Sequence, residues 1–499
     1  MKKILTAEQI READQHTIKY EPISSLDLME RASEQFVLRF LEVNRDKHPV
    51  KIFCGVGNNG GDGLAIGRLL KEKGWEVLLY VVGNPRKGSA DFKANLDRSE
   101  LYAVIDSKND FPNVSDDDII IDGLFGSGLS RPLEGLYEEI VTYLNEQKCL
   151  KFSIDIASGL YADQPLPSNA MAFSPDYTFS FQVPKLSFFL PGCHQYVGEW
   201  QLIDIGLDQS FIQKQKSHYF KTELQDIANH FPSRGKFTHK NEVGRLLIVA
   251  GSKGRMGAAV LCARAAFKTG VGLVNVCVPK CGIDILQIAV PEAMVIDGKG
   301  SNEIHGISKT VDTIVIGPGL GTKPKTISAF EKLLKETKNP IVIDADGVNI
   351  LSKKKSLLKF VPKESILTPH PGEFKRLVGE WKNDFEKLDK LRGFCKKYKI
   401  NLVLKGAYSA VCNSVGEIHF NSTGNPGLAT AGSGDVLAGI IGSLLAQGLD
   451  SFDAMRLGVY LHGLAGDEAV REARIEWIQA SDIIGYMPKA LSSILNRTL

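Results

Sequence analysis

Residues 425–435 place three glycines, a serine and an aspartate directly before an apolar segment, residues 436–445, that has the pattern of a helix. The N–H groups at the start of a helix are free and lie at the positive end of its dipole, and glycine leaves room for a phosphate. Residues 432–434 would therefore cradle an anion. Because a carboxylate repels phosphate, Asp435 would instead take a proton from, or orient, a hydroxyl group that meets the phosphate. The alternative is an ordinary helix cap.

A second glycine-rich loop lies in the first half of the chain. A short apolar strand at 50–54 runs into residues 55–63, which contain two adjacent asparagines and an aspartate among glycines, and a helix is expected at 64–73. This loop has neither the usual dinucleotide spacing nor the Lys-Ser/Thr of a P-loop. Its amides and carboxylate would contact a ligand that lies close to the backbone, whereas a simple turn rarely needs all of them.

Two further loops of this half follow predicted strands, at residues 122–132 and 155–160. In a parallel sheet such loops open at one edge, where ligands bind. Asn59, Asp122 and Ser158 can therefore meet in space. Three oxygen ligands with one charge would suit a weakly charged hard cation better than a divalent transition metal.

These first-half motifs resemble the NAD(P)H-hydrate epimerase family over about residues 1–210. The resemblance is carried by residues 58–63, 122–129 and 153–159. It implies a Rossmann-like domain that interconverts the R and S hydrates of NADH or NADPH (NADHX and NADPHX), with a bound potassium ion. The implied potassium ligands are Asn59, Asp122 and Ser158. The residues implied to contact the hydrated nucleotide are Asn58, Asn59, Gly60, Gly61, Asp62, Gly126, Ser127, Gly128, Leu129, Ser130, Arg131, Pro132 and Asp155.

Epimerisation at C6 requires the hydroxyl group to leave and return, or the ring to open and close, and either route needs an acid–base group. Asp155 is the first candidate and Lys185 the second. The alternative for Lys185 is a solvated surface lysine, because the residues before it depart from the family's Thr-Ala-Pro pattern. Ala157 stands where the family has proline, and this change leaves the oxygen ligands in place.

In the second half, five predicted strand ends carry polar or glycine-rich loops. His370 lies between two prolines, and we favour a ligand contact for it over a structural role. Lys405 and the N–H groups after it suit the phosphates of a nucleotide, with a surface turn as the alternative. Asp344 and Asp346 are helix caps or magnesium-associated groups, and the sequence does not choose between these roles.

Residues 317–321, 344–346, 368–373 and 425–435, in this order, resemble the ribokinase-like superfamily over about residues 230–495. Within it the match is closest to the ADP-dependent NAD(P)H-hydrate dehydratases. The resemblance implies that ADP phosphorylates the C6 hydroxyl of the S-hydrate and that phosphate is then eliminated, giving NAD(P)H, AMP and phosphate, with Mg²⁺ present. The implied hydrate contacts are Ala258, Gly319, His370 and the base Asp435. The implied nucleotide contacts are Lys405, Gly406, Ala407, Tyr408, Ser409 and Gly434.

The elements that must position these loops alternate between strand and helix along the whole chain, which predicts an α/β protein with two doubly wound domains, Rossmann-like and then ribokinase-like. We place the epimerase domain at residues 1–215 and the dehydratase domain at 225–499. A capping box at Thr6 predicts a first helix, and residues 25–43 predict a second. Both are expected to pack on the core and to offer a surface for a homo-oligomer.

The composition limits the possible partners. The 499 residues carry a net charge of +2, which indicates neither nucleic acid nor an anionic membrane, and no apolar run reaches the roughly 18–20 residues of a membrane span. The eight cysteines lack metal or redox spacing, so we expect reduced thiols in a cytoplasmic protein.

Two other functions compete with repair of hydrated cofactors. One is a ribokinase-like kinase for a vitamin precursor or sugar alcohol, with a non-catalytic N-terminal binding domain, which predicts a stable phosphorylated product. The other is a non-enzymatic binding module like those in decapping scaffold proteins. The intact motif at 58–63 and Asp155 argue against both, and no basic patch supports contact with RNA.

Overall fold

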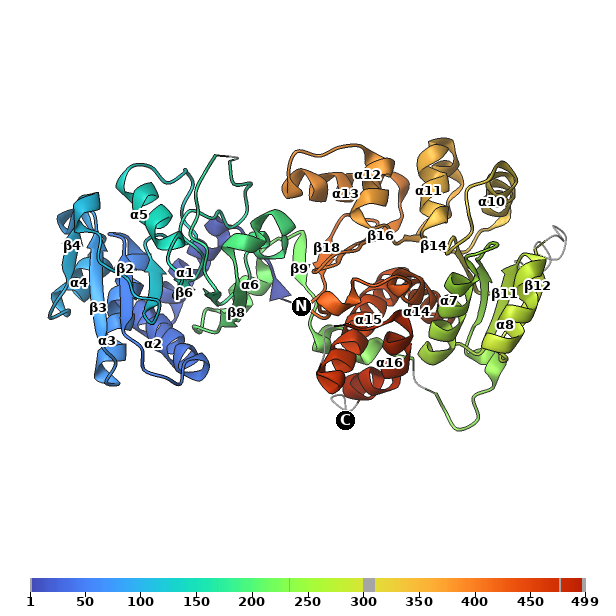
Figure 1. Ribbon diagram of the computed structural model, residues 1–499, viewed down its shortest axis with the longest axis horizontal. Helices are drawn as coiled ribbons and strands as arrows, with labels where there is room; N and C mark the ends of the chain where they lie inside the picture. The colour runs from blue at the N-terminus through green and yellow to red at the C-terminus, as the bar shows by residue number, and fades with distance from the viewer. Residues whose placement is uncertain (1, 168, 233, 299–309, 475–476, 496–499) are drawn as a thin grey trace. The chain divides into compact units, whose positions relative to one another are not determined.

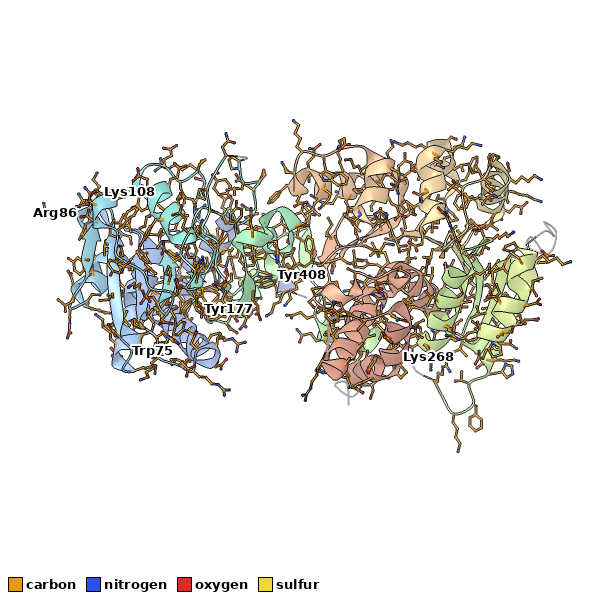
Figure 2. The ribbon with its side chains drawn as sticks, viewed as in Figure 1. Trp75, Arg86, Lys108, Tyr177, Lys268 and Tyr408 are labelled. Carbon is orange, nitrogen blue, oxygen red and sulfur yellow. The ribbon has the colours of Figure 1, made fainter. Side chains whose placement is uncertain are left out.

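The computed structural model describes residues 2–167, 169–232, 234–298, 310–474 and 477–495. The chain forms two compact units, one of residues 2–219 with 383–385 and one of residues 220–382 with 386–499. Each unit is built on its own sheet (Figure 1). Figure 2 draws the side chains of both, with Trp75 and Tyr177 in the N-terminal unit and Lys268 and Tyr408 in the C-terminal unit.

The N-terminal unit has a seven-stranded parallel sheet with the order β4-β3-β2-β5-β6-β7-β8. Its strands are β2 (Val50–Cys54), β3 (Val77–Val82), β4 (Ala103–Ile105), β5 (Ile119–Gly123), β6 (Leu150–Ile154), β7 (Tyr177–Phe181) and β8 (Glu199–Ile203). Its helices are α1 (Ala7–Tyr20), α2 (Ser25–Val43), α3 (Asn58–Glu72), α4 (Ala90–Asp97), α5 (Leu136–Asn145) and α6 (Gln209–Lys214); β1 (Lys2–Lys3) precedes them. The strand order reverses between β2 and β5, which places the ligand crevice outside the carboxyl ends of these two strands.

From β9 onward, the second sheet has the order β9-β18-β17-β16-β15-β14-β13-β10-β11-β12, parallel from β16 to β12 and antiparallel at β17 and β18. Its strands are β9 (Tyr219–Lys221), β10 (Arg245–Val249), β11 (Leu273–Val278), β12 (Met294–Asp297), β13 (Thr313–Ile316), β14 (Val342–Ile343), β15 (Ile366–Leu367), β16 (Asn401–Leu404), β17 (Ala410–Cys412) and β18 (Ile418–Phe420). The order reverses between β10 and β13, so the crevice of this sheet lies at their carboxyl ends. The predicted pair of doubly wound α/β folds is confirmed.

Helices cover both faces of the second sheet (Figure 1). One layer contains α7 (Met256–Thr269), α14 (Ser433–Ala446), α15 (Ser451–Ala473) and α16 (Ala480–Leu495), and the other contains α10 (Pro324–Glu336), α11 (Asp346–Lys353), α12 (Pro371–Val378) and α13 (Asp384–Tyr398). A further short helix, α8 (Ile283–Ala289), packs by β12. Small residues let α7 and α14 approach closely, since a Cβ on Gly439 would lie 2.2 Å from the Cys262 carbonyl oxygen. This contact fixes the start of α14 over the sheet.

Two helices begin earlier than predicted. α3 begins at Asn58 instead of residue 64, and α14 begins at Ser433 instead of residue 436. The glycines of α3 are tolerated because its first turns pass close to other backbone: a Cβ on Gly60 would lie 1.7 Å from the Gly55 carbonyl oxygen. Asn58 and Asn59 therefore stand in the first turn of α3, with Asp62 one turn further along, and Asp435 stands in the first turn of α14. Among the described residues, no helix is long and apolar enough to cross a membrane.

Candidate functional site

A cavity of about 590 Å³ lies at the carboxyl ends of β2 and β5 in the N-terminal unit. It is lined by Ile10, Arg11, Asp14, Gln15, Ile18, Ser25, Leu28, Met29, Ala32, Gly57, Asn58, Asn59, Asp62, Leu124, Phe125, Gly126, Ser127, Gly128, Leu129, Asp155, Phe181, Ile205 and Leu207. Of the predicted hydrate contacts, Asn58, Asn59, Asp62, Asp155 and the loop 126–129 are brought together here. Gly60, Gly61, Ser130, Arg131 and Pro132 lie outside this lining. The two glycines are buried within α3.

Asp122 and Ser158 meet below the cavity. The Ser158 hydroxyl donates to Asp122 Oδ1 at 2.6 Å, and the Ser158 amide donates to Oδ2 at 2.8 Å. Asn59 lies beside the loop that follows β5, where a Cβ on Gly126 would lie 3.3 Å from its Oδ1. Burial raises the pKa of Asp122 to about 6, against the hydrogen bonds from Ser158. Among the described residues, this buried carboxylate has no cationic partner, and Asn59 Nδ2 is buried without a hydrogen bond.

Asp155 forms a buried ion pair with Lys185, whose side chain is 0% exposed. The interpretation of Lys185 as a solvated surface lysine is therefore wrong. The ammonium group also donates to Ser180 Oγ at 2.7 Å, and the Phe181 amide donates to Asp155 Oδ1 at 3.0 Å. Asp155 adopts a positive φ of 65°, a costly conformation for an aspartate. The strained turn directs its carboxylate into both the ion pair and the cavity.

Helix α1 forms one wall of the cavity, which the sequence reasoning missed. The sequence predicts packing and an oligomer surface for α1 and α2, but one face of α1 packs on the core and another lines the cavity. Ile10, Ala13 and Thr17 are buried, while Arg11 and Asp14 line the cavity. Burial, and then the negative charge of Asp155, raise the pKa of Asp14 to about 7. The available signal was the helical spacing of polar residues beside the apolar face.

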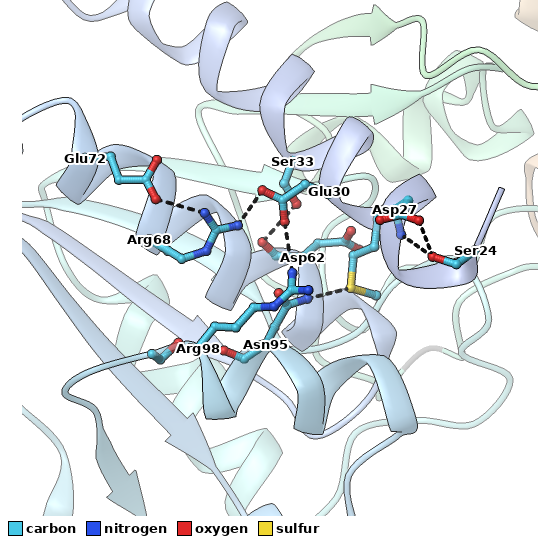
Figure 3. A network of polar contacts seen from close by, with 11 residues as sticks. Ser24, Asp27, Glu30, Ser33, Asp62, Arg68, Glu72, Asn95 and Arg98 are labelled. Atoms are coloured by element: carbon cyan, nitrogen blue, oxygen red, sulfur yellow. Dashed lines mark hydrogen bonds and ion pairs between the residues drawn. The ribbon is translucent and has the colours of Figure 1, made fainter.

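Asp62 is the third acid of the cavity. Its pKa is raised well above the usual value by burial and then by Asp155 and Asp14. A network holds the start of α3 in place (Figure 3). Ser33 Oγ donates to the Asp62 carbonyl oxygen at 3.4 Å. Glu30 of α2 pairs with Arg68 of α3 and lies 3.6 Å from Arg98, which follows α4.

In the C-terminal unit, the loops after β10 and β13 meet at the reversal of strand order. The Gly251 amide donates to the Pro318 carbonyl at 2.8 Å, and Ser252 Oγ donates to the Gly319 carbonyl at 2.7 Å. Ala258 packs against the same loop, because a Cβ on Gly319 would lie 3.1 Å from its Cβ. Two of the predicted hydrate contacts, Ala258 and Gly319, are thus adjacent.

Asp344, Lys405 and the start of α14 form a charged cluster. The Lys405 ammonium group lies 3.0 Å from Asp344 Oδ1, which also accepts from Thr368 Oγ1 at 2.7 Å. A Cβ on Gly434 would lie 3.1 Å from Lys405 Nζ. Burial and then Asp344 raise the pKa of Asp435 to about 7, while Lys405 opposes the rise. Burial alone would lower the pKa of Lys405, but Asp344 and then Glu373 and Asp435 outweigh it and raise that pKa.

The N-terminus of α14 is open, as an anion site requires. Its cap residue, Gly432, has a φ of 88°, and among the described residues no side chain caps this helix end. The alternative of an ordinary cap by Ser433 or Asp435 is therefore wrong. His462 contacts Ser433: the His462 Nε2 atom lies 3.2 Å from the Ser433 Oγ and 3.0 Å from the Ser433 carbonyl oxygen. His462 lies 29 residues away on α15 and was not predicted.

His370 caps α12: its Nδ1 accepts from the Gly372 amide at 3.1 Å, and the Glu373 carboxylate accepts from the His370 amide at 3.0 Å. The imidazole remains 53% exposed, so its contact with a ligand stays a prediction. Asp346 accepts from the Gly321 amide at 2.7 Å and lies 3.3 Å from Arg255. This arrangement gives Asp346 a structural role.

Residues 405–409 form a turn closed by Ser409. Its hydroxyl accepts from the Gly406 amide at 3.3 Å and donates to the Gly406 carbonyl at 3.1 Å. Lys405 points from this turn towards Asp344. The contact of this turn with a nucleotide remains a prediction.

Each of the two α/β units has a mainly parallel sheet, with acids at its strand ends beside the N-terminus of a helix. This arrangement is typical of enzymes that bind small anionic molecules, and here it occurs at two sites. A family model described as YjeF-related protein N-terminus matches residues 25–187, and one described as NAD(P)H-hydrate dehydratase matches residues 246–489. A ribokinase-like superfamily protein from Enterococcus faecalis is 25% identical with a TM-score of 0.52, covering 56% of this chain and 98% of its own.

Relatives match over nearly the whole length. The bifunctional NAD(P)H-hydrate repair enzyme of Thermofilum pendens is 32% identical over 99% of this chain, and that of Moorella thermoacetica is 33% identical over 98%. In both cases 97% of the relative is covered. The chain belongs to the family of bifunctional NAD(P)H-hydrate repair enzymes, as the two resemblances predicted.

Proposed function

We propose that this chain returns hydrated NADH and NADPH to the intact cofactors. The N-terminal part, residues 1–215, epimerises the R and S hydrates. The C-terminal part, residues 225–499, dehydrates the S-hydrate with ADP, giving AMP and phosphate. The observation that carries the proposal is that each unit places an acid at the carboxyl ends of its strands, Asp155 in the first and Asp435 in the second.

The geometry around Asp435 supports phosphoryl transfer. A carboxylate with a pKa of about 7 can accept the proton of the C6 hydroxyl near neutral pH. The open N-terminus of α14 and Lys405 would stabilise the charge on the transferring phosphoryl group. Because phosphate is a far better leaving group than hydroxide, the phosphorylated hydrate can then eliminate it. Lys405, Gly434 and residues 406–409 would hold ADP, and Ala258, Gly319 and His370 would contact the hydrate.

Asn59, Asp122 and Ser158 fit a monovalent cation such as K⁺. They offer one buried carboxylate, a hydroxyl group and a carboxamide, and within the described residues no cluster of three His, Cys, Asp or Glu forms a transition-metal site. A bound cation would balance the charge of Asp122 beneath the cavity. Mg²⁺ would bind through the phosphates of ADP.

A recovery assay tests the whole proposal. The purified chain is incubated with an R/S mixture of hydrated NADH, ADP and Mg²⁺, and absorbance at the NADH band is followed. Complete recovery is expected. Recovery of the S fraction alone would overturn the epimerase assignment, and a stable phosphorylated product without NADH would favour the kinase.

A further inference from the structure

Helix α1 presents a polar face to the N-terminal cavity. Arg11, Asp14, Gln15 and Ile18 line it with the i, i+3, i+4, i+7 spacing of one helical face. This helix precedes the segment that the family model matches, which begins at residue 25. The cavity is therefore lined in part by polar side chains of α1, which do not belong to the motifs at 58–63, 122–132 and 155–158.

The face of α1 runs from the glycine loop after β5 to the acid–base groups after β6 and β7. At one end, a Cβ on Gly128 would lie 3.7 Å from Arg11 Nη1. One turn further, Asp14 interacts electrostatically with both Asp155 and Lys185. Asp14 and the predicted reaction centre at Asp155 line the same cavity.

Asp14 and Asp155 are two carboxyl groups in contrasting environments. Asp155 is paired with the buried Lys185 ammonium and accepts a hydrogen bond from the Phe181 amide. Asp14 is partly buried, and among the described residues it forms neither an ion pair nor a hydrogen bond. Burial and the charge of Asp155 hold its pKa at about 7, so that near neutral pH roughly half of the Asp14 side chains carry a proton. Two carboxyl groups with different protonation states can serve as base and acid of one reaction.

We propose that Asp14 is the second acid–base residue of epimerisation, acting opposite Asp155; this inference rests on the proposed function of the unit. Asp155 takes the proton of the C6 hydroxyl, the C6–N1 bond breaks with its electron pair going to N1, and N1 takes a proton from Asp14. The open-chain aldehyde rotates about C5–C6. N1 then returns its proton to Asp14 and attacks the other face of the carbonyl, while the oxygen regains its proton from Asp155. Both residues end in their starting states.

Asp14→Asn keeps the shape of the side chain and removes its ability to transfer a proton. Epimerisation is measured on the pure R-hydrate without ADP, by chromatographic separation of the two epimers. Its kcat is expected to fall by about 100-fold or more. ADP-dependent dehydration of the S-hydrate by the same chain is expected to stay unchanged, which checks folding and concentration. Glu12→Gln, an exposed acid on the same helix, is the matched control, and Asp14→Glu should restore part of the rate.

The pH profile separates catalysis from a structural role. If Asp14 donates a proton, kcat should fall as the pH rises through about 7, and Asp14→Asn should lack this limb. The charged groups that face Asp14 are Asp155, Lys185, Asp62 and, on its own helix, Arg11. A wild-type rate in Asp14→Asn, or a change confined to KM, would overturn the proposal. A wild-type chain without any epimerisation would instead overturn the proposed function.

Discussion

At the scale of single residues, the two units tune acids by the same physical means. In the C-terminal site, burial and Asp344 raise the pKa of Asp435, and in the N-terminal cavity, burial and Asp155 raise the pKa of Asp14. In each case removal from water comes first and a second carboxylate adds to it. In the reactions that we propose, the same shift would serve a base in the C-terminal site and an acid in the N-terminal cavity, because a base must be ionised to act and an acid must be protonated.

Asp435→Asn removes the proposed base of dehydration. We expect ADP-dependent formation of NADH from the S-hydrate to fall by about 100-fold or more, with epimerisation unchanged. In the wild type, ionised Asp435 is the active form, so kcat should fall about tenfold per pH unit below about 7. Asp389→Asn, whose exposed side chain lies in the same unit, is the control. A wild-type kcat in Asp435→Asn would refute the assignment.

Lys185→Met removes one partner of a buried ion pair and leaves the other. We expect the N-terminal unit to lose about 3–5 kcal/mol of unfolding free energy, because the Asp155 carboxylate remains buried without its cation. The full chain is unfolded in urea, and hydrogen exchange of the β6 and β7 amides reports the unfolding free energy of this unit. Adding Asp155→Asn, which removes the unpaired charge and tolerates the positive φ of this residue, should restore much of it, and Lys87→Met, at an exposed position, should change little. A loss below about 1 kcal/mol in the single variant would contradict this account.

At the scale of elements, the tight turn between β2 and α3 depends on the absence of a side chain at residue 60. Gly60→Ala would place a Cβ 1.7 Å from the Gly55 carbonyl oxygen, and neither backbone segment can move without shifting its strand or helix. We expect a loss of about 1–3 kcal/mol of unfolding free energy in urea. At Gly57 a Cβ would meet nothing within 4 Å, so Gly57→Ala should change stability by no more than about 0.5 kcal/mol. Equal losses in both variants would show that steric contact is not the cause.

Sequence reasoning could predict these elements to the extent that their signals are local. Apolar strands, glycine-rich strand ends and the capping box at Thr6 each appear within a few residues, and the structure contains them. The early starts of α3 and α14 were missed because glycine and asparagine disfavour a helix unless tertiary contacts select it. The burial of Lys185 and the role of α1 were missed for another reason. Both depend on which element closes the cavity, and this tertiary contact cannot be predicted from a short segment of sequence.

At the scale of the whole molecule, the residues of each candidate site belong to one unit, so we expect the two activities to work from separate chains. An Asp155→Asn chain should recover only the S fraction of a hydrate mixture, and an Asp435→Asn chain should recover none. Mixing the two should restore complete recovery, because the epimerised hydrate can pass through solvent. NADH absorbance measures all three cases. Partial recovery in the mixture would mean that the hydrate must be transferred within one chain.

The raised pKa values of the acids in the N-terminal cavity also bear on competition among cofactors. Oxidised NAD⁺ carries a positive charge on its nicotinamide ring, whereas the hydrated ring has none. A cavity with three ionised carboxylates would attract the oxidised cofactor. NAD⁺ would then compete with the hydrated cofactor for the site. Burial raises the pKa of Asp14 to about 7 and that of Asp62 well above its usual value, and Asp155 is matched by Lys185, so the cavity offers that cation less negative charge than three ionised carboxylates would. The same raised pKa values that we propose to serve epimerisation would thereby also keep the site open to the damaged cofactor.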